Sequence, residues 1–120
     1  MDKIAVIEDD EDIRRLLVLR LRMAGFSALT AGDGESGLRL IRAEKPSVVI
    51  LDSMMPRMTG FAVCQAIRAD PDLRGTFIIF VSGSAVPEEF PDTGENSPDV
   101  YMAKPYNLDE LVNKIRTALA

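Results

Sequence analysis

Apolar positions along this chain follow two different periods. Five short segments are almost continuously apolar, which is typical of strands buried on both faces. These segments are Lys3–Glu8, Phe26–Ala31, Ser47–Leu51, Thr76–Val81 and Asp99–Ala103. The stretches that follow repeat their apolar residues every three or four positions, as Leu17 and Leu21 do, and this spacing predicts helices with one buried face. The pattern therefore predicts strands alternating with helices.

Local signals place the ends of the predicted helices. A first helix begins near Ile13 and is expected to stop at Gly25. Asp33 and Thr59 are suited to cap two further helices, which run to about residues 45 and 69. The last helix starts after Asn107, since Asn107 and Glu110 have the spacing of a capping box.

This alternation predicts an α/β fold in which helices cover both faces of a parallel sheet. Right-handed crossovers favour a doubly wound sandwich. The 120 residues suit one compact domain, and we expect a single domain over residues 1–120. The segment 83–99 departs from the pattern because it contains Pro87, Pro91 and Pro98. We expect a short or irregular fourth helix there.

The composition excludes several classes of partner and of catalytic mechanism. The net charge of −5 gives no electrostatic attraction to nucleic acid or to anionic membranes, so we expect neither as a direct partner. The absence of histidine excludes Ser-His-Asp and Cys-His catalysis. The lone cysteine, Cys64, cannot form an internal disulfide and is expected to be a packed core thiol. With no long apolar segment and no signal-peptide pattern, the expected location is the cytoplasm.

Polar residues collect where the predicted strands end. Glu8, Asp9 and Asp10 follow the first strand, and Asp52 ends the third. Ser82 follows the fourth strand and Lys104 the fifth. In an open parallel sheet these ends meet at one edge, which is where ligands bind.

Clustered carboxylates repel one another, and a hard divalent cation such as Mg²⁺ would relieve that repulsion. Taken singly, each residue has an ordinary structural explanation, since Asp is common at caps and turns and Lys104 could be a solvated surface charge. Together with the ammonium of Lys104, the carboxylates suit phosphoryl transfer. Asp52 can then act as a nucleophile that forms an aspartyl phosphate.

Four linked motifs make the chain resemble a response-regulator receiver domain of two-component signalling, in the CheY-like superfamily. They are "AVIEDDEDIRRLL", "VVILDSMMPRMTG", "FVSGSA" and "YMAKPY". The resemblance covers Lys3 to Leu119. It implies a flavodoxin-like (βα)5 sandwich with five parallel strands in the order 2-1-3-4-5.

The resemblance also implies roles at the site. Asp52 would be the phosphoacceptor. Glu8 and Asp9 would bind Mg²⁺ together with Asp52 and the backbone carbonyl of Met54. Lys104 would pair with a phosphoryl oxygen and is expected to precede a cis bond to Pro105.

Two residues are implied to change state on phosphorylation. The hydroxyl of Ser82 would move to bond the phosphoryl group, and Tyr101 would turn inward when Ser82 moves. The face formed by the segment 83–99, the fifth strand and the last helix would then change and signal to an output domain or protein. The proline-rich segment leaves this output step open.

The implied phosphodonor is a phosphohistidine on a sensor histidine kinase or a phosphotransfer protein. Such a chain would catalyse its own phosphorylation and dephosphorylation without being a conventional turnover enzyme. The resemblance also allows a homodimer.

Three other functions are compatible with parts of the sequence. An unphosphorylated receiver-like scaffold would work by protein contacts alone. The acidic pair, Asp52, Ser82 and Lys104 argue against it, whereas the proline-rich segment 83–99 argues for it. An aspartate-nucleophile phosphatase needs a second aspartate two positions after Asp52, where this chain has Met54. A flavin-binding protein would need a phosphate loop after the first strand, and the acidic run there would repel phosphate.

Overall fold

The computed structural model describes residues 2–83 and 96–120, and its strands form one parallel sheet in the order β2-β1-β3-β4-β5. The strands are β1 (Lys3–Ile7), β2 (Ser27–Ala31), β3 (Val48–Asp52), β4 (Phe77–Ser82) and β5 (Val100–Ala103). The predicted flavodoxin-like order is confirmed. Each predicted strand is present within a residue or two of its expected ends. Short apolar runs of this kind are typical of strands in a sheet that helices cover on both faces.

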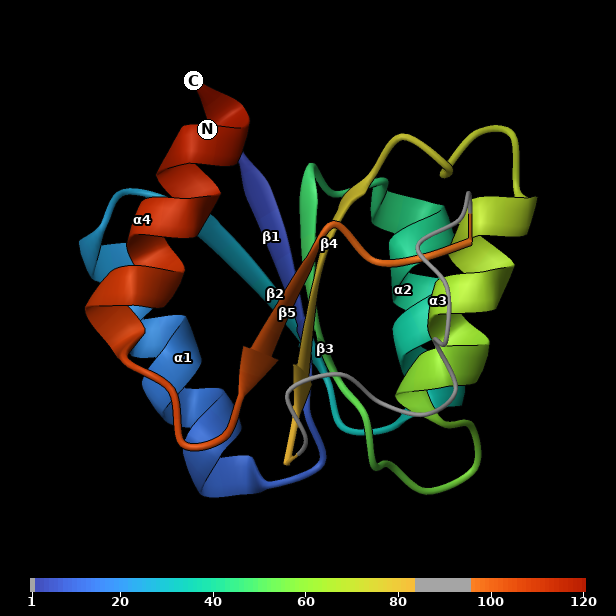
Figure 1. The fold of residues 1–120 in the computed structure, drawn as a ribbon, viewed down its shortest axis with the longest axis horizontal. Helices are drawn as coiled ribbons and strands as arrows, with labels where there is room; N and C mark the ends of the chain where they lie inside the picture. The colour runs from blue at the N-terminus through green and yellow to red at the C-terminus, as the bar shows by residue number, and fades with distance from the viewer. Residues whose placement is uncertain (1, 84–95) are drawn as a thin grey trace.

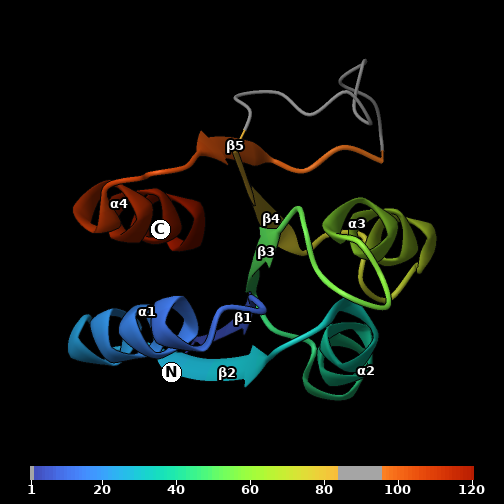
Figure 2. The ribbon, with the colours of Figure 1, turned by 90° about the horizontal axis from the view of Figure 1, so that it is seen from below.

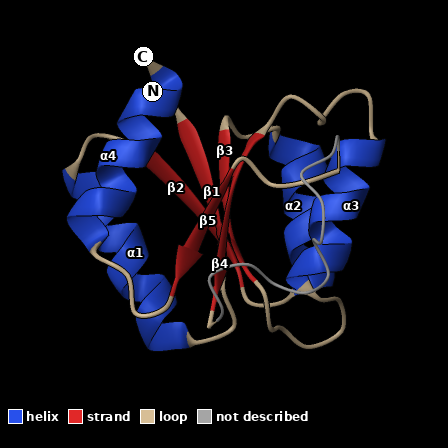
Figure 3. Ribbon diagram, in the orientation of Figure 1, coloured by secondary structure: helices blue, strands red, loops and turns tan. Residues whose placement is uncertain are grey.

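Helices cover both faces of the sheet, as Figures 1 and 2 show. On one side lie α1 (Glu11–Met23) and α4 (Leu108–Leu119), and on the other lie α2 (Gly34–Glu44) and α3 (Gly60–Ala69). Figure 3 shows the same three layers, with the strands between two helical layers. The predicted fourth helix falls mostly within residues 84–95, which lie outside the described residues, so α4 here is the last helix of the chain.

Two apolar clusters fill the spaces between the layers. One includes Ile7, Leu51 and Phe80 and is covered by α2 and α3. The other includes Val6 and Ile50 and is covered by α1 and α4. Neighbouring strand residues point to opposite faces, which explains why continuous apolar runs are needed in β1 and β3.

Side chains cap the helices as their sequences predict. Asp10, Asp33 and Thr59 each accept a hydrogen bond from a backbone N–H in the first turn of the helix that follows. Asn107 does the same for α4, where its Oδ1 lies 3.0 Å from the nitrogen of Glu110. Gly25 follows α1 with a φ of 95°, a left-handed conformation that glycine adopts without strain. These residues fix where each helix begins and where α1 ends.

Among the described residues, no helix is long and apolar enough to cross a membrane.

Candidate functional site

Two hydrogen bonds hold Glu8 in the loop that follows β1. The carboxylate of Glu8 is 4% exposed, and its Oε2 accepts a hydrogen bond of 3.1 Å from the nitrogen of Asp10. The guanidinium of Arg14 donates to the carbonyl of Glu8 at 2.9 Å. Since Asp10 also caps α1, the start of the helix holds this loop in one conformation. Asp9, between them, is exposed.

Asp52 is the last residue of β3, and its side chain is buried. Its backbone pairs in register with Val81, and the nitrogen of Ser53 donates to the carbonyl of Val81 at 3.0 Å. The sheet thus extends to the point where the carboxylate projects. A rigid strand end fixes the position of a reactive group better than a mobile loop does.

Lys104 reaches this site from the other side. Its Nζ lies 2.8 Å from Oδ1 of Asp52 and 3.6 Å from Oε1 of Glu8. Its backbone nitrogen donates to the carbonyl of Ser82 at 2.7 Å, so the loop after β5 continues the sheet pairing. The bond from Lys104 to Pro105 is cis. Through its contacts with Glu8 and Asp52, the ammonium of Lys104 bridges the carboxylates at the ends of β1 and β3.

The carboxylates of Glu8, Asp9 and Asp52 each offer one oxygen, and these oxygens lie within 4.8 Å of one another. Three carboxylates and one ammonium leave an excess of negative charge where two of the acids are buried. All the donors are oxygens, which are the ligands that hard divalent cations prefer. This donor set fits Mg²⁺ and does not suit a soft metal.

The pKa values reflect this crowding. Burial raises the pKa of Glu8 to about 7, against the hydrogen bond from Asp10, and the charge of Asp52 adds to the increase. For Lys104, partial burial would lower the pKa. The hydrogen bond to Asp52 and the charges of Asp52 and Glu8 outweigh this effect, so its pKa is raised and the ammonium stays protonated. The site thus favours a cation at the centre of the carboxylates.

The remaining predicted residues lie around this cluster. Ser82 ends β4 and is buried, next to the strand that carries Asp52. Tyr101 lies in β5, and its ring meets Phe80 edge to face with centroids 6.1 Å apart. Met54 follows two positions after Asp52, with a side chain that is largely exposed.

Two further residues at the site were missed by the sequence analysis. A Cβ added at Gly60 would lie 2.1 Å from the carbonyl oxygen of Asp52, so only glycine fits there. Tyr106 follows the cis proline; burial raises its pKa to about 12, and the charge of Glu8 adds to the increase. The glycine was visible in the motif after Asp52, whereas no sequence signal distinguished Tyr106.

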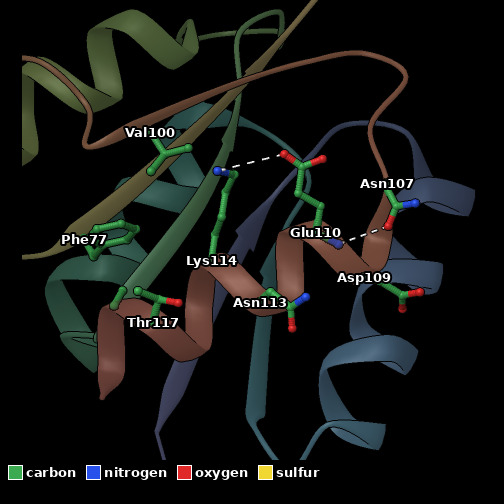
Figure 4. Close-up of a pocket in the computed structure, with 9 residues that line it drawn as sticks. Phe77, Val100, Asn107, Asp109, Glu110, Asn113, Lys114 and Thr117 are labelled. Atoms are coloured by element: carbon green, nitrogen blue, oxygen red, sulfur yellow. Dashed lines mark hydrogen bonds and ion pairs between the residues drawn. The ribbon is translucent and has the colours of Figure 1, made fainter.

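A separate groove of about 740 Å³ lies between α4 and the strands β4 and β5. Phe77 and Val100 contribute apolar surface, and the ion pair between Glu110 and Lys114, 3.9 Å long, lies at its edge (Figure 4). This groove contains none of the residues predicted to bind metal or phosphate, so it is distinct from the candidate site.

Comparison with known proteins identifies the family. The protein-family model that describes the response regulator receiver domain matches residues 4–116 of this sequence. The chain belongs to this family. A solved structure of the Vibrio cholerae chemotaxis protein CheY4 superposes on this receiver domain with a TM-score of 0.88 and 27% identity, covering 98% of both chains.

Curated relatives agree with this assignment. The receiver domain is 40% identical over 119 residues to a probable transcriptional regulator, ycf27, of Guillardia theta. It is 33% identical over 117 residues to the DNA-binding response regulator MtrA of Mycolicibacterium smegmatis. Both alignments cover 98% of this chain but only 45% and 50% of the relatives, so the chain spans about half of their length.

These relatives correct the predicted partners. The prediction excluded nucleic acid, yet MtrA is named as a DNA-binding response regulator and ycf27 as a probable transcriptional regulator. The exclusion used the net charge of −5, which describes only these 120 residues. Because the matched relatives are about twice as long, the charge of the receiver region cannot decide whether nucleic acid is a partner.

Proposed function

We propose that this receiver domain is a phosphorylation-dependent switch of a two-component system in which Asp52 accepts a phosphoryl group. The observation that supports it best is the convergence at Asp52. Lys104 lies 2.8 Å from its Oδ1, and Glu8 and Asp9 offer carboxylate oxygens within 4.8 Å. Phosphoryl transfer depends mostly on positioning and charge neutralisation, and these residues can provide both.

Glu8, Asp9 and Asp52, with the backbone carbonyl of Met54, would hold Mg²⁺. When bound, this cation supplies positive charge that neutralises the phosphoryl oxygens. Two buried acids next to a single ammonium are costly without a further cation, and this cost supports the assignment.

In the proposed step, a carboxylate oxygen of Asp52 forms a bond to phosphorus as the P–N bond of a phosphohistidine donor breaks. The leaving imidazole keeps the electron pair of that bond and takes a proton from solvent. Lys104 would pair with a phosphoryl oxygen, and the Ser82 hydroxyl would donate a hydrogen bond to another. In autodephosphorylation, water would attack the same phosphorus as the bond to the Asp52 oxygen breaks, which would release inorganic phosphate and restore the carboxylate.

The phosphoryl group adds about −1.5 to −2 charge at pH 7. Ser82, at the end of β4, would move toward the phosphoryl group. Tyr101 would follow, because it lies in the neighbouring strand β5 and its ring packs against Phe80 of β4. The surface formed by β5 and α4 would then change and control an output. The names of the relatives, which include transcriptional regulators, support such a role.

Phosphorylation with a small donor tests the proposal. The protein is incubated with acetyl phosphate and Mg²⁺, and intact mass is measured over time. We expect one added phosphoryl group of about 80 Da in the wild type and none in Asp52→Asn. Both proteins should lack the added group when EDTA is present. An unmodified wild type would favour a scaffold that works by protein contacts alone.

A further inference from the structure

A basic groove lies along the open edge of the sheet. β2 is an edge strand, and Figure 2 shows it at one end of the sheet with α1 beside it. A groove of about 460 Å³ lies between these two elements. The described residues that line it come from α1 and β2, and they are Arg14, Arg15, Val18, Leu19, Arg22, Ala28 and Thr30. None of these residues is acidic, so the groove concentrates positive charge on a chain whose net charge is −5.

The three arginines differ in how far their charges are already paired. Arg14 donates to the backbone carbonyl of Glu8, which carries no net charge. Arg15 lies 2.6 Å from Glu11, but both side chains are more than half exposed, so this ion pair is weak. Within the described part of the chain, the guanidinium of Arg22 makes no hydrogen bond or ion pair. Arg15 and Arg22 are therefore available to an added anion.

The backbone of β2 offers hydrogen-bonding groups beside these arginines. In a parallel pair, alternate residues of a strand bond to the same neighbouring strand. The nitrogen of Ser27 donates to the carbonyl of Asp2, and the carbonyl of Ala31 accepts from the loop after β1, so the odd-numbered residues of β2 face β1. Ala28 and Thr30 therefore direct their N–H and C=O groups toward the open edge. An extended segment of another chain can pair with such groups.

An acidic segment in an extended conformation fits both the charge and the open edge. Arg15 and Arg22 lie seven positions apart in α1, or about 10 Å along its axis. Carboxylates two positions apart in a strand are about 7 Å apart, and two long arginine side chains can cover the difference. A second copy of this chain fits less well, because two-fold pairing of β2 strands would bring both sets of arginines to the same edge, where like charges repel.

We propose that the groove between α1 and β2 binds an extended acidic segment of a partner protein, which adds as a strand to the edge of the sheet. The backbone groups of Ala28 and Thr30 pair with the segment, while Arg15 and Arg22 bind its carboxylates. The groove is lined by none of the residues that would hold Mg²⁺ or the phosphoryl group. The inference therefore does not depend on phosphoryl transfer to Asp52.

A peptide probe tests this inference without Mg²⁺ or a phosphodonor. The probe is a capped hexapeptide of alternating glutamate and valine, and its binding to isotope-labelled protein at low salt is followed by NMR. We expect saturable shifts of the backbone amides of Ala28 and Thr30. A hexapeptide of alternating lysine and valine should not bind. Failure of the acidic peptide to bind, or equal binding of the basic one, would overturn the proposal.

Methylated forms of the acidic peptide test whether it pairs with the strand edge. One form is N-methylated on all its glutamates and the other on all its valines. One of these two sets of amides must face β2 if the peptide adds to the sheet, so at least one form should lose binding. If both forms bind as well as the unmodified peptide, pairing with the edge is excluded and the proposal is wrong.

Two variants with the same change in charge separate the groove from the charge of the whole chain. Arg22→Gln removes a guanidinium from the groove, and Arg42→Gln removes an exposed arginine from α2, on the other side of the sheet. We expect Arg22→Gln to weaken binding of the acidic peptide by about three- to tenfold, and Arg42→Gln to leave it unchanged. Equal affinities in the two variants would contradict the proposal.

The protein alone tests whether a second copy occupies the edge instead. The amide shifts of Ala28 and Thr30 are measured over a range of protein concentrations without peptide. We expect these shifts to stay constant. Shifts of both amides that change with protein concentration would show that a second copy pairs with β2, and would overturn the assignment of the groove to an acidic partner.

Discussion

At the scale of single residues, the site combines buried carboxylates with an ammonium, and each of these charges would destabilise the fold if it were buried without the others. Glu8 and Asp52 are both 4% exposed, and Lys104 is the ammonium that contacts both carboxylates. Removing one partner of such an arrangement leaves buried charge without compensation. If these residues carry out the proposed phosphoryl transfer, they contribute to stability as well, and their variants need controls that separate the two effects.

The ammonium of Lys104 should be essential for phosphorylation. Lys104→Met keeps most of the side-chain volume but removes the charge next to Asp52. We expect the rate of phosphorylation by acetyl phosphate to fall by about 10²-fold, as when a preorganised donor is lost from an active site. Intact mass over time gives the rate. Lys114→Met, which removes a surface lysine paired with Glu110, should keep the wild-type rate. Equal rates in the two variants would contradict the role of Lys104.

The raised pKa of Glu8 predicts how stability depends on pH without divalent cations. The pKa rises from 4.5 unfolded to about 7 folded, so the folded state binds more protons between these values. The free energy of unfolding should therefore fall as pH rises from about 4.5 to 7 and level off above it.

Urea denaturation in EDTA at several pH values measures this effect. The difference between wild type and Glu8→Gln reports Glu8 together with its electrostatic effect on Asp52 and Lys104, while contributions from distant groups cancel. Mg²⁺ at millimolar concentration should reduce the decline, since it binds the ionised carboxylates. Parallel curves for wild type and Glu8→Gln would show that the pKa of Glu8 is not raised.

At the scale of elements, the loop between β3 and α3 determines where Asp52 lies. Gly60 begins α3 directly after the capping residue Thr59, and the carbonyl of Asp52 lies against it. The nitrogen of Gly60 donates to the carbonyl of Ser53 at 3.2 Å. The first turn of α3 and the last residue of β3 are therefore packed backbone to backbone, which leaves no room for a side chain.

Gly60→Ala should destabilise the protein through this contact. The added Cβ would lie 2.1 Å from the carbonyl oxygen of Asp52, so the loop must shift. We expect a loss of about 1–3 kcal/mol in the free energy of unfolding, measured in urea. Gly75→Ala is the matched control, because a Cβ there meets nothing within 4 Å. Similar losses in both variants would show that the contact at Gly60 has no special cost.

At the scale of the whole molecule, two apolar clusters fill the space on either side of the sheet. Cys64 is fully buried in the cluster between the sheet and the pair α2 and α3. Burial raises the pKa of its thiol to about 11. A thiol that is both inaccessible and protonated can react only after the structure opens.

The single cysteine therefore reports opening of the molecule. At pH 8, reaction of Cys64 with a disulfide reagent should be at least about 10³-fold slower in the native protein than in urea, given the usual stability of a domain. The rate should rise with urea in step with the unfolding transition followed by circular dichroism. Rapid labelling of the native protein would show that α3 opens locally without global unfolding.

Sequence patterns predicted elements better than they predicted contacts between them. Apolar runs located the described strands, and the capping residues Asp33, Thr59 and Asn107 located three helix starts, because burial and capping depend on residues close in sequence. The strand order came from the resemblance to a family. The segment 84–95 lies outside the described residues, and the prediction of a short fourth helix there stays a prediction.

The sequence by itself determined which chemical groups stand at the ends of the strands, because strand ends follow from local apolar runs and parallel strands end at one edge. Only the tertiary structure decided that Lys104 lies 2.8 Å from Asp52, that Gly60 lies against the Asp52 carbonyl, and that Arg68 holds Ser97 and Asp99. These contacts join residues up to 52 positions apart. They depend on how packed layers bring distant loops together, which no local pattern encodes.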